Sequence, residues 1–324
     1  MKRRPVLVAL SAATAFLCAG THAQPERYPA KPIRLIVPFA PGGGNDLIAR
    51  MIGQRLTAMW GQPVIVDNRP GAGGNVAAET TARTAPDGYT AFQYNIANTI
   101  APSIYRTLRY DPIADFAPVT QIAASPFVLI AHPSVPAKSL PELIAMAKQA
   151  PGKWSYGSSG NGGSTHLAME LLKSMTHTEF VHVPYGGGLQ GLNDVIAGNI
   201  QLMFTVPMTA VPQMQAGRVR GLAVSGTKRL ALAPELPTVD ESGVPGYESS
   251  AWYGLVLPAH TPPRIVNALH DAVVRVISEP EFAQKLTSNA MQVGGSTPAQ
   301  FSAFIRSEVG KWARVVKVSR AVVN

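Results

Sequence analysis

Three glycine-rich segments each stand between a short apolar run and a segment with helical spacing. They are residues 41–45, 71–75 and 157–164. Backbone N–H groups at the start of a helix have no partner within it, and the helix dipole favours negative charge there. Glycine lets a ligand approach this backbone because it has no Cβ. The pattern indicates an anion site built on main-chain donors, and the alternative is three ordinary turns between strands and helices.

Amide and hydroxyl side chains in two of these segments favour a small polar ligand. They are Asn45 in the first segment and Ser158, Ser159, Asn161, Ser164 and Thr165 at the third. Neither segment contains Arg or Lys, so we expect capture of an organic anion by amides and hydroxyls. The chain contains no Gly-x-x-x-x-Gly-Lys-Ser/Thr, and the second segment lacks the third glycine of a dinucleotide fingerprint. These absences disfavour a nucleotide.

Residues capable of covalent or metal chemistry do not form a familiar constellation. No serine lies in Gly-x-Ser-x-Gly, and the single cysteine, Cys18, lies in the leader described below. His166 and Glu170 are four residues apart on a predicted helix, but the spacing supplies no third metal ligand. His177 and His182 match no standard metal spacing. We therefore expect no metal, no cofactor and no catalysis, with an exported hydrolase as the weaker alternative.

The first 23 residues of the 324 are typical of a secretory signal. Three basic residues precede the apolar run 6–20, and Thr21 and Ala23 offer small side chains for cleavage. That run is shorter than the ~20 residues of a membrane span. Cleavage would leave 25 basic and 19 acidic residues and no cysteine. We predict a soluble exported protein of the bacterial periplasm. The positive charge is spread thinly along the sequence, which suits binding of an anionic small molecule. It forms no basic stripe with interleaved aromatic residues, so binding of nucleic acid is disfavoured.

Short strands and helices alternate around the three segments. The predicted strands are 33–38, 64–66, 89–94, 127–131, 153–156, 180–183, 201–204, 220–224 and 252–257. One predicted helix of about four turns is capped by Asn45 or Asp46. The other predicted helices are 76–84, 140–149, 164–175, 189–197, 262–277, 280–289 and 298–313. This alternation predicts parallel sheets with helices on both faces. Because no Gly/Ser linker divides the chain, we expect two halves joined by crossing strands.

Several long motifs occur in a characteristic order. They are residues 28–46, with Pro41-Gly42-Gly43-Gly44-Asn45-Asp46 at the end, then 68–75, 85–90, 110–119, 158–162, 182–185, 237–239, 254–255 and 296–301. They resemble the motifs of Bug-type receptors, the periplasmic solute-binding proteins of tripartite tricarboxylate transporters. The resemblance covers essentially the whole mature chain.

The resemblance implies an α/β fold of the type II periplasmic binding kind, with two doubly wound domains around a ligand cleft. The implied units are a signal peptide at 1–23, domain 1 at 24–125 plus 247–324, and domain 2 at 126–246. In that family two loops, one from each domain, grip a ligand carboxylate, partly through ordered water. The segment 71–74 is also a family motif, and we interpret it as a structural turn.

The implied ligand-binding residues come from two loops and from further positions around the cleft. The loop residues are Phe39, Ala40, Gly42, Gly43, Gly44, Asn45, Asp46, Ser158, Ser159, Gly160, Asn161, Gly162, Ser164 and Thr165. The other positions are Asn95, Tyr185, Gly186, Thr205 and Trp252.

Three positions depart from the commonest family pattern. Thr205 occupies a position where an aspartate is frequent in the family, and Gly187 occupies one where many members carry lysine. Asn45 occupies a position where threonine or serine is usual. Without that aspartate to hold an ammonium group, a mono- or dicarboxylate or an aromatic acid is favoured over an amino acid. We expect a monomer that delivers its ligand to membrane permease subunits. A periplasmic sensor that reports its ligand to a signalling protein is the alternative.

Overall fold

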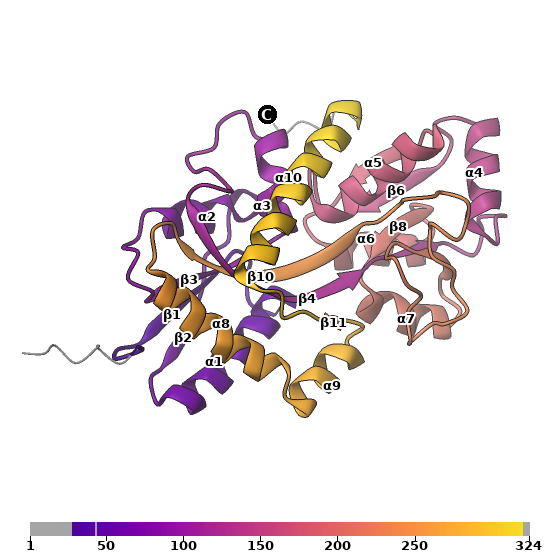
Figure 1. The fold of residues 1–324 in the computed structure, drawn as a ribbon. Helices are drawn as coiled ribbons and strands as arrows, with labels where there is room; N and C mark the ends of the chain where they lie inside the picture. The colour runs from indigo at the N-terminus through magenta and orange to yellow at the C-terminus, as the bar shows by residue number, and fades with distance from the viewer. Residues whose placement is uncertain (1–27, 43, 320–324) are drawn as a thin grey trace, which may run out of the picture.

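The computed structural model describes residues 28–42 and 44–319, so the predicted leader and Gly43 lie outside the described residues. Two β-sheets, each covered by helices on both faces, form two lobes side by side (Figure 1). We call the first sheet with its helices the first lobe, and the second sheet with its helices the second lobe.

The first sheet is mixed rather than parallel. Its strands are β1 (Ile33–Val37), β2 (Val64–Asn68), β3 (Thr90–Asn95), β4 (Phe116–Pro126), β10 (Ser250–Pro258) and β11 (Gln292–Val293), in the order β11-β4-β10-β3-β1-β2. Strands β1, β2 and β3 pair in parallel, as expected. Strand β10 runs antiparallel to both β3 and β4, which corrects the prediction of a fully parallel sheet. The reason is that β4 and β10 carry the chain to the second lobe and back.

Helices cover both faces of the first sheet. One face carries α1 (Gly44–Trp60), α8 (Pro263–Ile277) and α9 (Pro280–Ser288), and the other carries α2 (Asn75–Ala82), α3 (Ile96–Ile104) and α10 (Pro298–Ser319), with the 3-10 turn η1 (Ala72–Gly74) before α2. Helix α8 buries Ile265, Leu269, Val273 and Val276, whose spacing of three and four residues places them on one side. The same spacing rule allowed these long helices to be predicted.

The second sheet has the order β7-β6-β8-β5-β9. Its strands are β5 (Val128–Ala131), β6 (Ser155–Ser158), β7 (Val181–Pro184), β8 (Leu202–Thr205) and β9 (Arg220–Val224). Strand β6 is parallel to β7 and β8, whereas β5 is antiparallel to β8 and β9. Helices α4 (Leu140–Gln149) and α5 (Ser164–Thr176) contribute to one core and α6 (Gly188–Ala197) and α7 (Pro207–Gln215) to the other.

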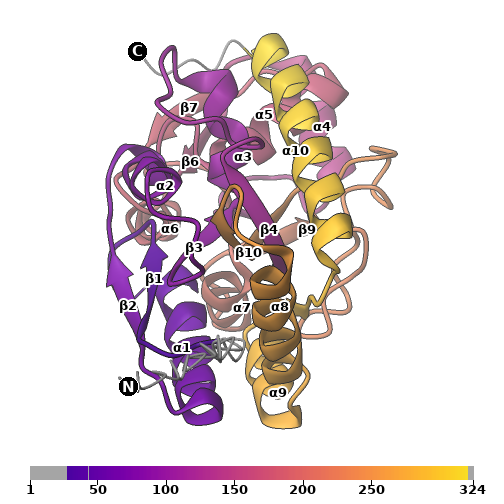
Figure 2. The same cartoon turned by 60° about the vertical axis from the view of Figure 1, so that its left-hand side comes forward.

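Two neighbouring segments connect the lobes. Strand β4 passes into β5 through Phe127, and the chain returns through Ser249 into β10, so that the paired strands β4 and β10 run from the first sheet towards the second (Figure 1). Figure 2 shows both strands near the middle of the molecule. The buried Ser225 hydroxyl accepts a hydrogen bond from Phe127 N at 2.7 Å and donates a short one to Ser249 O. The predicted crossing strands are therefore present, and one side chain joins the outgoing and returning segments.

Helix α10 contacts elements of both lobes. It packs against α3 and β4 of the first lobe and against α5 of the second. Leu167 of α5 is fully buried in the same apolar core as Phe301 and Trp312 of α10. This shared core lies beside the crossing segments.

Candidate functional site

A cavity of about 510 Å³ is lined by residues of both lobes. Its lining includes the starts of α1 and α5, the junction between β3 and α3, and the crossing segments. Among the described residues, all that line it are uncharged, and many are apolar or aromatic, including Phe39, Ile96, Phe127 and Met203. A ligand charge in this cavity would therefore be balanced by backbone and side-chain dipoles.

The predicted site residues divide between the cavity wall and its support. Those on the wall are Phe39, Gly44, Asn45, Asn95, Ser159, Asn161, Gly162, Ser164, Thr165, Thr205 and Trp252. Those outside the wall are Ala40, Gly42, Asp46, Ser158, Gly160, Tyr185 and Gly186, while Gly43 lies outside the described residues. Residues from the two predicted loops thus meet at one cavity, as the sequence analysis expects of a ligand site.

Asp46 fixes the first loop from behind and does not line the cavity. Its Oδ2 accepts hydrogen bonds from Gly42 N at 3.0 Å and Arg50 Nε at 2.9 Å, and its Oδ1 accepts from Asn68 Nδ2 at 3.0 Å. The Arg50 hydrogen bond is the main cause that keeps the pKa of the Asp46 carboxyl below its usual range. These contacts give the Asp46 side chain a structural role in the loop, and its predicted role in ligand binding stays a prediction.

Two hydroxyl groups tie the ends of the other loop together. Thr165 Oγ1 accepts a hydrogen bond from Ser159 N at 3.0 Å and lies 3.0 Å from Ser159 Oγ. Ser158 Oγ lies 2.7 Å from His182 Nε2, since Ser158 is the last residue of β6 and His182 belongs to the neighbouring parallel strand β7. Ser158 therefore supports the loop from below.

Two stacked histidines form the base of this loop. The rings of His166 and His182 are 3.8 Å apart and nearly parallel, at 4°. His166 Nδ1 accepts the backbone N–H of Gly162 at 2.9 Å, which fixes the loop above it. Burial lowers the pKa of His166 to about 3 and that of His182 to about 4, so both rings are neutral near pH 7.

The predicted pair of His166 and Glu170 is a structural contact. His166 Nε2 lies 3.8 Å from Glu170 Oε1, which accepts hydrogen bonds from Tyr156 Oη and Lys173 Nζ, each at 2.6 Å. Within the part of the chain that the structure describes, no group of three His, Cys, Asp or Glu side chains could hold a metal ion. These groups instead form a buried polar network beneath the loop.

The N-terminus of α5, with its backbone N–H groups, lies at the cavity wall. The helix begins at Ser164, and its N-cap residue, Gly163, provides no side-chain hydrogen bond. The first N–H groups of a helix have no partner within that helix. Ser164 and Thr165 both line the cavity, so the α5 N-terminus can present donors to a ligand. Helix α1 begins on the opposite wall at Gly44.

Two predicted residues of the second lobe lie outside the cavity wall and contact α6. The Tyr185 hydroxyl donates a hydrogen bond to Asp194 Oδ2 at 2.6 Å, and Gly186 N donates one to Gln190 Oε1 at 3.1 Å. Both interactions connect this segment to α6, and neither residue lines the cavity. The neighbouring glycines Gly187 and Gly188 line it instead.

Trp252 has a mainly structural environment although it borders the cavity. Its side chain is buried, and its indole N–H donates to Glu308 Oε2 at 3.1 Å. The next residue, Tyr253, also lines the cavity and is absent from the predicted set. Strand alternation did not indicate Tyr253, because neighbouring residues of β10 point to opposite faces of the sheet and Trp252 was the residue chosen.

The second glycine segment contributes to the wall. Gly73 lines the cavity beside Tyr105, and a Cβ on Gly73 would lie only 2.9 Å from the Tyr105 hydroxyl oxygen. This segment therefore borders the cavity in addition to forming the predicted turn. A glycine is needed here both for its φ of +65° and for the approach of Tyr105.

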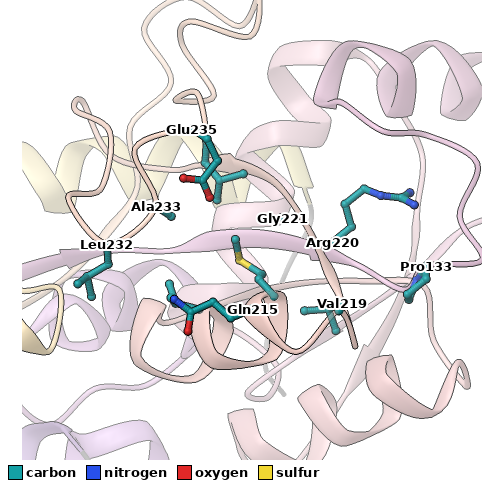
Figure 3. A pocket seen from close by; sticks show the side chains of 12 residues that line it. Pro133, Gln215, Val219, Arg220, Gly221, Leu232, Ala233 and Glu235 are labelled. Atoms are coloured by element: carbon teal, nitrogen blue, oxygen red, sulfur yellow. The ribbon is translucent and has the colours of Figure 1, made fainter.

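A second hollow of about 530 Å³ lies at the β9 edge of the second sheet (Figure 3). It is lined by parts of α7 and β9 and by residues such as Arg220, Leu232 and Glu235. No predicted ligand residue lines it, so the cavity between the lobes is the stronger candidate site. None of the described helices is long and apolar enough to cross a bilayer.

Comparison with known proteins agrees with this geometry. The family model of the tripartite tricarboxylate transporter family receptor matches residues 48–320. The chain is 31% identical to Protein BugT of Bordetella pertussis, over 99% of this chain and 98% of that protein.

Two solved structures share the fold. Rpa4515 of R. palustris with adipate is 36% identical, with a TM-score of 0.81, over 91% of this chain and 99% of that one. MatC of Rhodopseudomonas palustris with bound malate is 29% identical, with a TM-score of 0.78, over 89% and 100%. The predicted type II-like fold and the Bug-type resemblance are confirmed. The chain belongs to the receptor family of the tripartite tricarboxylate transporters.

Proposed function

We propose that this protein is a periplasmic receptor that captures a small organic carboxylate between its lobes for a tripartite tricarboxylate-type transporter. The observation that carries the proposal is the uncharged cavity with the start of a helix from each lobe on its wall. Helix N-termini favour an anion without a cationic side chain. Rpa4515 with adipate and MatC with malate support this ligand class.

In the proposed complex, the carboxylate and the carbon skeleton of the ligand contact different parts of the cavity. The carboxylate accepts hydrogen bonds from the α1 and α5 loops, each worth about 1.5–3 kcal/mol for a charged acceptor. The carbon skeleton contacts apolar wall residues such as Phe39 and Met203. We propose that the lobes correspond to the two predicted domains and close on the ligand, so that the closed form is the one a permease binds.

Thermal unfolding of the mature protein with a panel of carboxylates tests this function. Adipate, malate and benzoate would be compared with uncharged amides of the same acids. A binding acid at about 100 times its Kd should stabilise the fold by about 2.7 kcal/mol. Absence of stabilisation by every acid would refute the proposed ligand class.

A single backbone donor can be removed without breaking the helix. Ser164 is the first residue of α5, a position that proline tolerates, and Gly163 has the extended backbone that precedes proline readily. Ser164→Pro deletes one N–H and should weaken binding by about 10- to 150-fold. Ser164→Ala keeps that N–H and is the matched control. Equal affinity of the two variants would contradict capture by the α5 amides.

A further inference from the structure

Two side chains on the first-lobe wall have hydrogen-bonding capacity that the protein does not use. Tyr253 and Asn95 lie directly opposite each other on the antiparallel strands β10 and β3, and both line the cavity. Among the described residues, the Tyr253 hydroxyl has no hydrogen-bond partner. Asn95 is only 4% exposed, and its Nδ2 also has no partner.

The orientation of the Asn95 amide follows from its role at the start of α3. Its Oδ1 accepts the backbone N–H of Ala97 at 2.9 Å, as part of a capping box. The remaining amide group is therefore a donor. An unpartnered buried donor costs about 1–3 kcal/mol, which a ligand acceptor would offset.

The Tyr253 hydroxyl reaches the first turn of α1. A Cβ on Gly44 would lie 2.8 Å from the Tyr253 hydroxyl oxygen, so any larger residue at position 44 would displace the tyrosine. The ring itself packs in the apolar core of the first lobe, where phenylalanine would serve equally well. Burial raises the pKa of Tyr253 to about 12, so the hydroxyl keeps its proton and can donate to an anion.

We propose that Tyr253 and Asn95 together form a two-donor seat for a carboxylate oxygen of the ligand, next to the N-terminus of α1. This inference rests on the proposed function and adds Tyr253 as a ligand-binding residue. The seat lies on the wall opposite α5, so the ligand would contact donors from both lobes. Because the free Asn95 amide group can only donate and the Tyr253 hydroxyl can donate beside it, the seat favours an acceptor oxygen over an ammonium group.

Calorimetry on two near-isosteric variants tests the seat, with adipate, malate and benzoate as probes. Tyr253→Phe removes one oxygen and should weaken the bound acid by about 10- to 150-fold. The melting temperature of the free variant should stay equal or rise, because its unpartnered hydroxyl is gone. Asn95→Asp keeps the capping oxygen but replaces the donor with a negative charge, and should weaken binding by at least 100-fold.

Tyr94→Phe is the matched control. The Tyr94 hydroxyl donates to Pro112 O at 2.8 Å in the core, so this variant should lose stability and keep its affinity. A wild-type protein that binds none of the acids would overturn the proposed function and the seat with it. A wild-type protein that binds an acid which Tyr253→Phe binds equally well would overturn only the seat.

Discussion

Asp46 shows how one side chain can hold a binding loop while remaining outside the cavity. Asp46→Asn would remove the negative charge beside Arg50. It would also replace one acceptor oxygen with an NH2 group, which would face a hydrogen-bond donor of Gly42, Arg50 or Asn68 without accepting from it. We expect a loss of about 1–3 kcal/mol in the free energy of unfolding, together with weaker ligand binding.

Urea unfolding and calorimetry would measure the two effects of Asp46→Asn. Glu79→Gln is a suitable control, because Glu79 forms an ion pair with the exposed Arg83 at 2.7 Å and such pairs contribute at most about 1 kcal/mol. If both variants lost the same stability, Asp46 would not have the role described.

The stacked histidines predict an acid-sensitive fold. Their pKa values of about 3 and about 4 lie below the ordinary value of 6.5, so between pH 6.5 and pH 4 the unfolded chain binds more protons. The free energy of unfolding is therefore greatest above pH 6.5 and falls as the pH falls, by up to about 1.4 kcal/mol per pH unit for each histidine. The charged groups in this network are Glu170 and Lys173, beside Tyr156.

The variant His166→Asn tests the contribution of His166 to the pH dependence of the free energy of unfolding. An asparagine oxygen can still accept the Gly162 N–H, but it does not titrate. Urea unfolding from pH 4 to pH 8 should show a shallower acid slope for this variant than for the wild type. An equally steep slope would show that His166 does not contribute to the pH dependence.

Residue types and spacing predicted which segments meet at the cavity better than the contacts that each residue makes there. Glycine loops before helices could be recognised from the local sequence, and residues of the two predicted binding loops line the same cavity. The orientation of Asp46 towards Arg50 and of Ser158 towards His182 depends on partners elsewhere in the fold. Tyr253 was missed for a similar reason, because its free hydroxyl becomes evident only when β10 lies beside β3.

Helix α10 is anchored to the sheet by a buried carboxylate. Glu308 Oε2 accepts the indole N–H groups of Trp252 at 3.1 Å and Trp312 at 3.0 Å, and Lys311 pairs with its other oxygen. Glu308→Ala would leave two buried donors without partners and should reduce the free energy of unfolding by about 2–4 kcal/mol.

Tryptophan fluorescence during urea unfolding would report the loss directly. Glu308→Gln keeps one acceptor oxygen and should lose less stability than Glu308→Ala. Glu279→Ala, at an exposed pair with Arg55, should stay within about 1 kcal/mol of the wild type. Similar stability of Glu308→Ala and Glu279→Ala would refute the anchoring role.

Elements with a regular apolar pattern were predicted well, and those with a proline in their interior were missed. The helix expected at 164–175 is α5, Ser164–Thr176. Helix α7 was not predicted, since Pro207 and Pro212 interrupt its pattern, although Pro207 occupies a helix start where it is tolerated. Strand β4 contains Pro118 and several polar residues, so only its antiparallel pairing with β10 identifies it.

At the scale of the whole molecule, the two lobes should unfold together. The Ser225 hydroxyl connects the crossing segments, and Leu167 of the second lobe is buried in the core around α10. We expect scanning calorimetry to show one transition whose calorimetric and van't Hoff enthalpies agree. Two resolved transitions, with only one shifted by a bound acid, would contradict this coupling.

The central position of β10 in the first sheet constrains when this protein can fold during synthesis. Strands β3 and β4 do not pair with each other, because β10 lies between them, and β10 is made only after the whole second lobe. A nascent chain that ends before Ser250 therefore leaves β3 with an open edge and β4 with no partner strand, so the first sheet is incomplete. Folding of that lobe must wait for the last quarter of the polypeptide, so a long incomplete chain stays accessible to chaperones and to proteases.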